Sequence, residues 1–299
     1  MNQKKIKHLY LNFSTFDLWQ TCQAKLNYSS ILNLEANTQK SSKGLTAAQK
    51  GTLVHKCLDA AAKLGDWEDT FEAICDEQEY ALPLSELKLH QSGSKEHLRS
   101  LLKAYMHKWK WPSQDIQVLQ SEVRLEAPIT PWLTAVGTID SIIRENDEMK
   151  LMDHKTSSGL YRWLIPSIDV SDQFTLYLLL ARANGFMVNS MIVDGICTDK
   201  TALETENGLF ARIETSRSDE QISDFRERFI NIAMDIKQGI ENNTFQPRMG
   251  KTCNDFGSLC HYYSICASPT KTISENVKAN SFKAKLQTED QSFKIIWED

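Results

Sequence analysis

The stretch LTAVGTIDSIIRENDEMKLMDHK, residues 133–155, decides the fold of this 299-residue chain. Two runs rich in apolar and β-branched residues flank the polar letters RENDE, which are typical of a turn. The midpoint between Asp140 and Asp153 lies between Asn146 and Asp147, inside this polar run. The stretch therefore predicts a β-hairpin in which Asp140 and Asp153 lie opposite each other.

Two carboxylates in these positions need a reason, because directly opposed like charges destabilise a sheet. A cation bound between Asp140 and Asp153 would remove that cost. Strand alternation puts Lys155 on the same face as Asp153 and turns His154 to the other face. Carboxylate oxygens suit Mg²⁺ or Mn²⁺, which polarise a phosphoryl oxygen and activate water, while the amine orients the water. Two surface aspartates with a lysine salt bridge on a solvated hairpin are the alternative.

The rest of the chain predicts a mixed α/β core. Thr46 and Gln49 form a capping-box pattern at the start of a helix, and Ser14 is the candidate N-cap of an earlier helix. The apolar periodicity changes from helical to strand-like near residue 116 and returns to helical near residue 172. Helices are expected at 14–27, 47–63, 67–80, 93–110, 172–184 and 218–240, and strands at 116–125, 133–143, 149–154, 187–197 and 209–213.

Four short motifs follow one another in an order that resembles the PD-(D/E)xK nuclease superfamily. Gly51–His55 resembles the GxxxH motif on the helix before the sheet. Gly137–Asp140 and Asp153–Lys155 resemble the split metal-binding motif, and Gln173–Tyr177 resembles the downstream QxxxY helix. The resemblance covers roughly residues 10–267 and is closer to the RecB-like exonuclease branch with an iron–sulfur cluster, as in AddB-type subunits. It implies a restriction-endonuclease-like αβββαβ core, which is the order that the periodicity predicts.

The resemblance also implies a role for each motif residue. Gln173 and Tyr177, one helical turn apart, would contact DNA or support the site, although they also fit the polar edge of a packed helix. Glu122 is a candidate outer ligand, but its position is more typical of an exposed strand carboxylate. The implied ligands of Mg²⁺ or Mn²⁺ are His55, Asp140, Asp153 and the backbone carbonyl of His154. His55 alone would otherwise fit a packed core histidine. Lys155 would position or activate the attacking water.

Seven cysteines, an odd number, in a chain without a secretory signal argue against a disulfide framework. Three of them, Cys57, Cys75 and Cys197, lie in apolar or helical surroundings and are expected to be buried small hydrophobes. The other four are Cys22, near the start, and Cys253, Cys260 and Cys266, which crowd into one short aromatic-rich segment.

These last four cysteines resemble the family's cluster ligands, with Cys22 as the distant N-terminal partner of the C-terminal three. The six residues between Cys253 and Cys260 exceed the spacing that is common in AddB-like proteins. Four thiolates suit either a 4Fe–4S cluster or tetrahedral zinc, and the resemblance favours the cluster. Such a clasp would close a loop of more than 200 residues. By analogy with a disulfide, this closure would contribute about 5 kcal/mol.

The charge pattern leaves a nucleic-acid partner open. A formal net charge of −5 does not indicate a generally basic surface, yet binding depends on how charge is distributed. The segment 88–110 carries six basic residues, with Glu96 as its one acid and Trp109 and Trp111 at its end. It fits a phosphate-binding face with stacking aromatics, but such a segment is more often an ordinary solvated helix.

The chain is expected to form one nuclease domain over residues 1–267, followed by a polar, flexible tail at 268–299. No apolar run is long enough to cross a bilayer, and the N-terminus lacks the features of a secretory signal, so a cytoplasmic location is expected. Within the domain we expect a helical part at 14–110, a catalytic sheet core at 116–240 and a cluster segment at 245–267.

The sequence therefore predicts an Mg²⁺- or Mn²⁺-dependent deoxyribonuclease, an exonuclease by resemblance, in DNA recombination, repair or phage replication. Gly250, Lys251 and Thr252 are not part of a phosphate loop, because Phe245 stands where that motif requires glycine. Any motor activity would then come from a separate helicase or recombination protein. Two alternatives are a non-cleaving DNA-binding module of the same fold and a cytosolic zinc-binding interaction protein.

Overall fold

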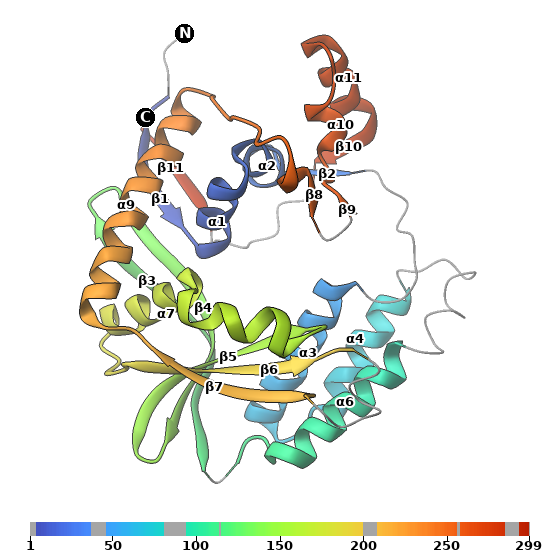
Figure 1. Cartoon of the computed structure of the whole chain (residues 1–299), viewed down its shortest axis with the longest axis vertical. Coiled ribbons are helices and arrows are strands. Elements are labelled where there is room, and N and C mark those ends of the chain that lie inside the picture. Colours follow the sequence, from blue (N-terminus) through green and yellow to red (C-terminus); the bar gives the residue numbers. More distant parts are fainter. Residues whose placement is uncertain are drawn as a thin grey trace. The chain divides into compact units, whose positions relative to one another are not determined.

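The chain forms two compact units, which are described separately below. The first unit combines Met1–Lys40, Glu126–Gly137 and Ser223–Asp299, and the second combines Ser41–Leu125 and Thr138–Ile222. The described residues after 268 thus belong to the first unit. Figure 1 shows the computed structural model of the chain. The structure describes residues 4–36, 46–80, 94–113, 115–199, 208–255, 258–284 and 293–298.

The second unit is built around a mixed sheet, as the sequence predicts. β4 and β5 pair antiparallel, β5 and β6 pair parallel, β6 and β7 pair antiparallel, and β3 pairs with β4. With α3 before these strands and α7 between β5 and β6, the unit contains the predicted αβββαβ order. The strands are β3 (Ile116–Thr130), β4 (Leu133–Glu145), β5 (Glu148–Ser157), β6 (Ser190–Cys197) and β7 (Phe210–Ser216).

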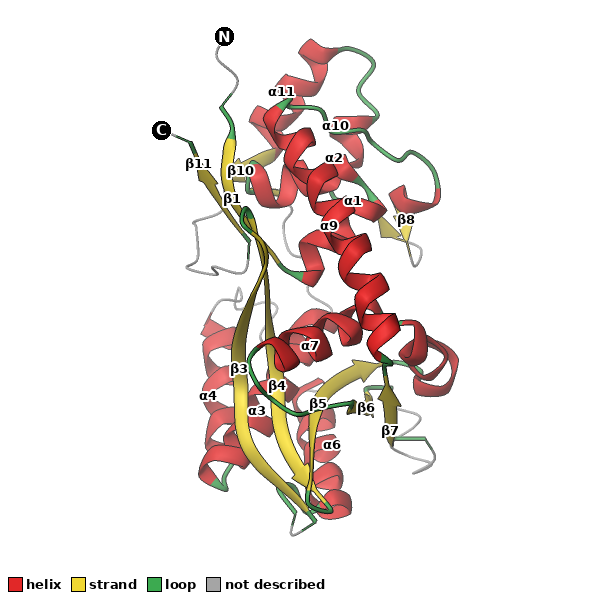
Figure 2. Ribbon diagram, turned by 90° about the vertical axis from the view of Figure 1, so that its left-hand side faces the viewer, coloured by secondary structure: helices red, strands yellow, loops and turns green. Residues whose placement is uncertain are grey.

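Different helices cover the two faces of this sheet. Met152 of β5 and Ile192 of β6 belong to an apolar core with α3, α4 and α6, which Figure 2 shows grouped beside the long strands β3 and β4. On the other face, Lys155 lies over the ring of Phe174 in α7, at 5.8 Å from Nζ to the ring centre. The helical segments of this unit are α3 (Ala47–Leu64), α4 (Glu68–Tyr80), α6 (Ser94–Trp109), η2 (Leu160–Leu164), η3 (Ile165–Val170) and α7 (Asp172–Ala183).

The start and end of α3 follow from its sequence. The capping box is formed in both directions, because Thr46 accepts from the backbone N–H of Gln49 and the Gln49 side chain accepts from the backbone N–H of Thr46. Gly65 ends the helix in the left-handed conformation, with φ at 73°. This prediction is confirmed, and the helix holds Leu53 and Cys57 in the core.

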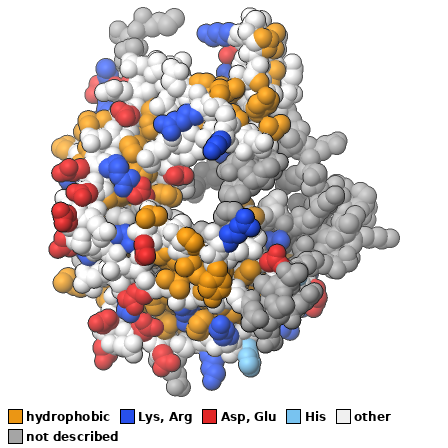
Figure 3. All heavy atoms as spheres, in the orientation of Figure 1, with side chains coloured by type: hydrophobic (Ala, Val, Ile, Leu, Met, Phe, Trp, Pro, Cys, Tyr) orange, Lys and Arg blue, Asp and Glu red, His pale blue; other side chains and the backbone are white. Residues whose placement is uncertain are grey.

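The basic residues of α6 are largely matched by acids of α4. Lys95 and Arg99 both form ion pairs with Glu72, and Lys103 lies 3.6 Å from Glu68. Lys88, the first residue of the predicted basic run, lies outside the described residues. These pairs offset part of the positive charge along this helix, while Lys108 lies over the ring of Trp109. On the face drawn in Figure 3, acidic and basic side chains are interspersed, in keeping with the net charge of −5.

The first unit joins the two ends of the chain in one sheet. β1 (Ile6–Leu11) pairs parallel with β4 and antiparallel with β11 (Lys294–Trp297). The described residues after 268 thus include helix and strand elements where the sequence predicts a polar, flexible tail. The remaining elements are α1 (Phe13–Thr21), α2 (Gln23–Leu26), η1 (Asn27–Ile31), β2 (Leu34–Ala36), α9 (Asp219–Glu241), η4 (Lys251–Cys253), β8 (Asn254–Asp255), β9 (Ser258–Leu259), α10 (Tyr263–Cys266), α11 (Lys271–Ser281) and β10 (Phe282–Ala284).

The predicted helix at 14–27 is divided into shorter pieces. Its N-cap is Asn12, whose side chain accepts from the backbone N–H of Thr15 at 2.8 Å, so Ser14 lies inside the helix instead of capping it. Cys22 interrupts the helix with an extended backbone, at φ −166°. Among the described residues, no helix has both the length and the apolar character needed to span a membrane.

Candidate metal centre

The β4–β5 hairpin has the predicted turn. Asn146 and Asp147 both adopt positive φ, at 49° and 65°, which is the conformation of a tight two-residue hairpin turn. From this turn the strands pair in register as far as Ser141, which lies opposite Met152. The register therefore agrees with the symmetry of the sequence, and the next residues of the two strands are the two aspartates.

Asp140 is held by contacts from two elements. Its Oδ2 accepts a hydrogen bond of 2.7 Å from the backbone N–H of His154 on β5. The same oxygen lies 3.3 Å from Nδ1 of His55, which comes from α3. The carboxylate thus connects the helix to both strands of the hairpin.

Asp153 and Lys155 lie on the same face of β5, as the alternation predicts. Lys155 Nζ donates to Asp153 Oδ1 at 3.2 Å and lies 2.9 Å from Oδ2. Asp153 is only 1% exposed, and its Oδ2 has no hydrogen-bond partner within the described part of the chain. This oxygen is compensated by its 2.9 Å ion pair with Lys155, and a carboxylate oxygen has a second lone pair that can accept a further electropositive partner.

Gly51 explains how α3 reaches the sheet. A Cβ at this position would lie 3.2 Å from Oγ1 of Thr156 on β5, closer than side chains normally approach. The absence of a side chain therefore lets the first half of α3 pack closely over β5. His55, one turn further along, is brought to Asp140 by this approach.

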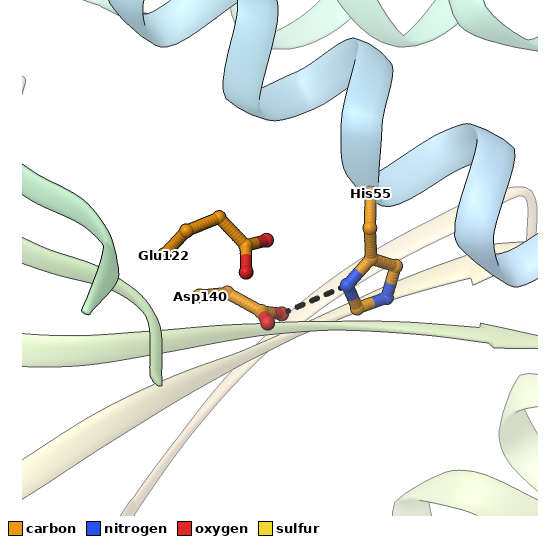
Figure 4. A group of neighbouring side chains, drawn as sticks. All are labelled: His55, Glu122 and Asp140. Atoms are coloured by element: carbon orange, nitrogen blue, oxygen red, sulfur yellow. Dashed lines mark ion pairs between the residues drawn. The ribbon is translucent and has the colours of Figure 1, made fainter. Parts of the chain in front are cut away.

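Glu122 joins His55 and Asp140 in one group (Figure 4). Each of the three residues offers a ligand atom, and these atoms all lie within 4.8 Å of one another. Glu122 is exposed, as expected for a strand carboxylate, but its positive φ of 50° interrupts the regular strand and aims the side chain at the centre. The sequence offers Glu122 as a candidate outer ligand, but the alternation of β3 carries no signal for the bend that brings it into the group.

The ring of His154 packs edge-on against the ring of His55, with 6.1 Å between the ring centres. Nδ1 of His154 lies 2.9 Å from Oδ2 of Asp194, a fully buried residue on β6. The hydroxyl of Tyr105 donates to the same carboxylate, and Nε of Arg212 donates to its Oδ1 at 3.3 Å. This buried network lies behind the motif strand and fixes the backbone that donates to Asp140. No sequence pattern indicates this network, because it depends on the parallel pairing of β5 with β6.

The residues around Asp140 favour its charged form. Burial disfavours ionisation, but the contact with His55 and the charges of His55 and His154 outweigh it and lower the pKa of Asp140 to about 2. Burial likewise lowers the pKa of His55, yet the carboxylates of Asp140 and Asp153 outweigh this effect and raise it. The pKa of Glu122 is raised by burial and by the charges of Asp140 and Asp59.

Asp153 behaves differently from Asp140. Burial raises its pKa, the charge of Lys155 partly offsets this, and the nearby charge of Asp140 raises it further. For Lys155, burial lowers the pKa, but Asp153 outweighs burial and raises it. A second positive charge near Asp153 would therefore stabilise its ionised form.

The helix α7 closes one side of this arrangement. Gln173 Nε2 donates to the hydroxyl of Tyr177 at 2.8 Å, so the two motif residues contact each other as one helical turn predicts. Burial and the charge of Asp153 raise the pKa of Tyr177. The structure thus brings the predicted residues of α3, the hairpin and α7 into one region of the second unit.

The donor set fits a hard divalent cation. Asp140 and Glu122 supply carboxylate oxygens, His55 supplies one imidazole nitrogen, and Asp153 adds the oxygen that lacks a hydrogen bond. Carboxylate-rich sites of this composition suit Mg²⁺ or Mn²⁺. Among the described residues, the ligand atoms of His55, Glu122 and Asp140 lie within 4.8 Å of one another, and Asp153 is not part of this close group.

The four cysteines of the first unit line a common pocket. Cys253 and Cys260 are brought together by a backbone hydrogen bond of 2.8 Å from Cys260 N–H to the Cys253 carbonyl. Burial raises the pKa of the Cys266 thiol, and the nearby charges of the other three cysteines raise it further. The remaining three cysteines, Cys57, Cys75 and Cys197, are buried as predicted.

Comparisons with known proteins agree with this architecture. The family model described as the PD-(D/E)XK nuclease superfamily matches residues 10–267. No curated protein matches the sequence significantly. A crystal structure of a candidate exonuclease from Eubacterium rectale has 11% identity, covers 91% of this chain and 93% of its own, and gives a TM-score of 0.51, which shows a shared fold. An alkaline exonuclease from Laribacter hongkongensis has 10% identity, a coverage of 66% and 96%, and a TM-score of 0.33.

Proposed function

Because the chain belongs to the PD-(D/E)XK nuclease superfamily, we propose that it is a metal-dependent deoxyribonuclease that hydrolyses phosphodiester bonds. One observation carries the proposal: the His55–Asp140–Glu122 group lies next to the ion pair of buried Asp153 with half-buried Lys155. Structural carboxylates are normally exposed or fully paired, whereas this region collects several acids around one lysine. A site of this kind suits metal-assisted hydrolysis of a phosphate ester.

In the proposed site each residue has a defined role. His55, Asp140, Glu122 and Asp153 would hold Mg²⁺ or Mn²⁺, together with the backbone carbonyl of His154. The bound ion supplies Lewis acidity and lowers the pKa of water. Lys155, held at 2.9 Å by Asp153, orients the water and offsets the negative charge that develops on the phosphoryl group. The catalytic residues are thus Asp140, Asp153 and Lys155.

Gln173 and Tyr177 support this arrangement or contact DNA. Their mutual hydrogen bond fixes both side chains on the face of α7 that borders Asp153. The fold shared with the candidate exonuclease of Eubacterium rectale supports the more specific proposal of an exonuclease. DNA recombination, repair or phage replication is the expected setting, with a separate helicase or recombination protein supplying any motor activity.

For the cysteine pocket we propose a 4Fe–4S cluster bound by Cys22, Cys253, Cys260 and Cys266, as in the AddB-like branch. The support is that cysteines distant in sequence line one pocket of the first unit. Four thiolates complete the ligand set of such a cluster, although tetrahedral zinc uses the same set. In either case the bound group would join the N-terminal and C-terminal segments of this unit.

The test of the nuclease proposal is cleavage of labelled single-stranded and double-stranded DNA with Mg²⁺ or Mn²⁺. Asp153→Asn is expected to lower the rate by at least about 100-fold, because it removes charge from the site while keeping the shape of the side chain. Glu148→Gln is the matched control, since Glu148 is an exposed acid at the other end of β5. Its rate is expected to equal that of the wild type.

Two outcomes would contradict the proposal in different ways. Equal rates for the wild type and Asp153→Asn would exclude the proposed site. Binding of DNA by the wild type without any metal-dependent cleavage would instead favour the non-cleaving module of the same fold.

A further inference from the structure

An open pocket of about 600 Å³ extends from the candidate metal centre over the surface of α3. It contains His55, Glu122 and Asp140, but it continues beyond them along the helix. The metal centre therefore occupies only part of a larger depression within the second unit. The lining residues are Gly51, Thr52, His55, Lys56, Asp59, Lys63, Glu122, Thr138 and Asp140.

The part of the pocket beyond the metal centre is one face of α3. Thr52, Lys56, Asp59 and Lys63 are spaced by four, three and four residues, which places their side chains in a row along a helix. The row covers about 16 Å at 1.5 Å per residue. This length accommodates a short stretch of a polymeric substrate and exceeds what a single phosphate group would need.

The lysines in and beside the pocket differ in whether an acidic residue pairs with them. Lys63 is tied to Asp59 by an ion pair of 2.8 Å, and Asp59 also accepts from the hydroxyl of Ser121 at 2.5 Å. Lys155, behind the metal centre, is paired with Asp153. Lys56 is exposed and forms neither an ion pair nor a hydrogen bond with any described residue. It is therefore the free cation among the described lining residues.

A lysine without an acidic partner at this place can attract the phosphates of a nucleic acid. The acids of the metal centre repel the phosphates of an approaching nucleic acid, and a bound divalent ion offsets that repulsion at one phosphate only. Neighbouring phosphates of the same strand need a separate positive partner. Lys56 follows His55 directly on α3 and reaches the same pocket, so it is placed to contact a phosphate next to the one at the metal centre.

We infer that Lys56 binds a backbone phosphate adjacent to the scissile one, and that the substrate strand lies along the α3 face from Thr52 to Lys63. This inference rests on the proposed nuclease function and adds the path of the substrate. Lysine contacts to phosphates position a strand without reading its sequence. The pocket thus binds DNA by its backbone, and recognition at Lys56 is independent of the bases.

The experiment measures binding without cleavage. A fluorescent single-stranded oligonucleotide is titrated with the wild type and with Lys56→Gln in the absence of divalent ions, at several KCl concentrations. Loss of one phosphate contact is expected to raise the Kd about tenfold. It is also expected to reduce the slope of log K against log salt by about 0.7. Lys56→Arg keeps the charge and is expected to restore both values.

Lys103→Gln is the control for net charge, because Lys103 is an exposed lysine on α6 that does not line the pocket. Unchanged affinity and slope for Lys56→Gln would overturn the inference, whether or not the wild type cleaves DNA. An effect of the same size for Lys103→Gln would also overturn it. Binding that depends on Lys56 in a protein that never cleaves would support the inferred path and contradict the nuclease proposal instead.

Discussion

Asp140 and Asp153 are neighbours across a hairpin, yet their surroundings act on them in opposite directions. The contact with His55 lowers the pKa of Asp140 to about 2, whereas burial raises the pKa of Asp153. Asp140 is therefore ionised before any ion arrives. The ionised form of Asp153 is stabilised by positive charge from Lys155 and from a bound cation. The two carboxylates therefore repel each other most strongly only when Asp153 is ionised, which is the state that a cation would stabilise.

A pH prediction at the same scale concerns Cys57, a buried thiol on α3. Burial and the nearby Cys75 raise its pKa from 9.0 to about 12. Between these values the unfolded chain releases a proton that the folded chain retains. The free energy of unfolding is therefore unaffected by this group below about pH 9 and falls as the pH rises from 9 to 12, by at most about 1.4 kcal/mol per pH unit.

The measurement is urea unfolding between pH 8 and pH 11 for the wild type and Cys57→Ala. The variant loses some packing and is expected to be less stable at pH 8, but its decline at alkaline pH should be shallower. Curves that decline in parallel would show that this thiol does not titrate as the structure indicates.

Single residues also mark the limit of prediction from sequence. The positions of Asp140, Asp153 and Lys155 follow from strand alternation and a turn, which are local properties. Glu122 joins the centre only because its backbone adopts positive φ, and Asp194 contacts His154 only because β6 pairs with β5. The contact of Asp194 depends on a strand that is distant in sequence, and the bend at Glu122, a candidate ligand from the sequence, is not visible in the alternation of β3.

At the scale of elements, the position of α3 decides whether the centre forms. Gly51 packs against Thr156, and His55 and Lys56 follow on the next turn of the helix. An alanine in a helix normally stabilises it by as much as about 1 kcal/mol relative to glycine. Here the added methyl group would push the helix away from β5. The substitution is therefore expected to lower activity without a matching loss of stability.

Gly51→Ala is expected to lower the cleavage rate while leaving thermal stability nearly unchanged, and Gly51→Val is expected to lower the rate further. Thr156→Ala removes the oxygen that the new side chain would meet. The double variant Gly51→Ala/Thr156→Ala should therefore recover part of the lost rate, in a double-mutant cycle of kcat/KM values. Additive effects of the two substitutions would contradict this account of the glycine.

The elements that the sequence predicted best are those with local signals. The hairpin has paired positive-φ residues at its turn, and α3 has a capping box. β1 and β11 were missed, because each is short and is stabilised by pairing with residues almost 300 positions away. No periodicity within four to six residues identifies a strand whose partner is that distant.

At the scale of the molecule, the first unit is assembled from both ends of the chain and a middle segment. The proposed cluster would fasten those ends through Cys22 and the three C-terminal cysteines. By the loop-closure argument such a fastening contributes about 5 kcal/mol to stability. The cluster is thus expected to act as a structural clasp in this unit.

Anaerobically purified protein is expected to contain about four iron and four sulfide ions per chain and to be brown. Cys266→Ser should lose this iron and unfold at a lower temperature. Cys197→Ser is the control, because this buried cysteine belongs to the second unit and should leave the iron content unchanged. Metal analysis that finds zinc and no iron would contradict the cluster, while the nuclease proposal would remain.

The pairing of β1 with β11 also sets an order for events during synthesis. Ile6 lies opposite Trp297, so the first strand leaves the ribosome 291 residues before its partner. At about 5 to 20 residues per second, this strand waits roughly 15 to 60 s with one edge open. The second unit ends at Ile222 and can fold during that interval. Until β11 is made, this edge of β1 presents unpaired backbone groups that could pair with another chain.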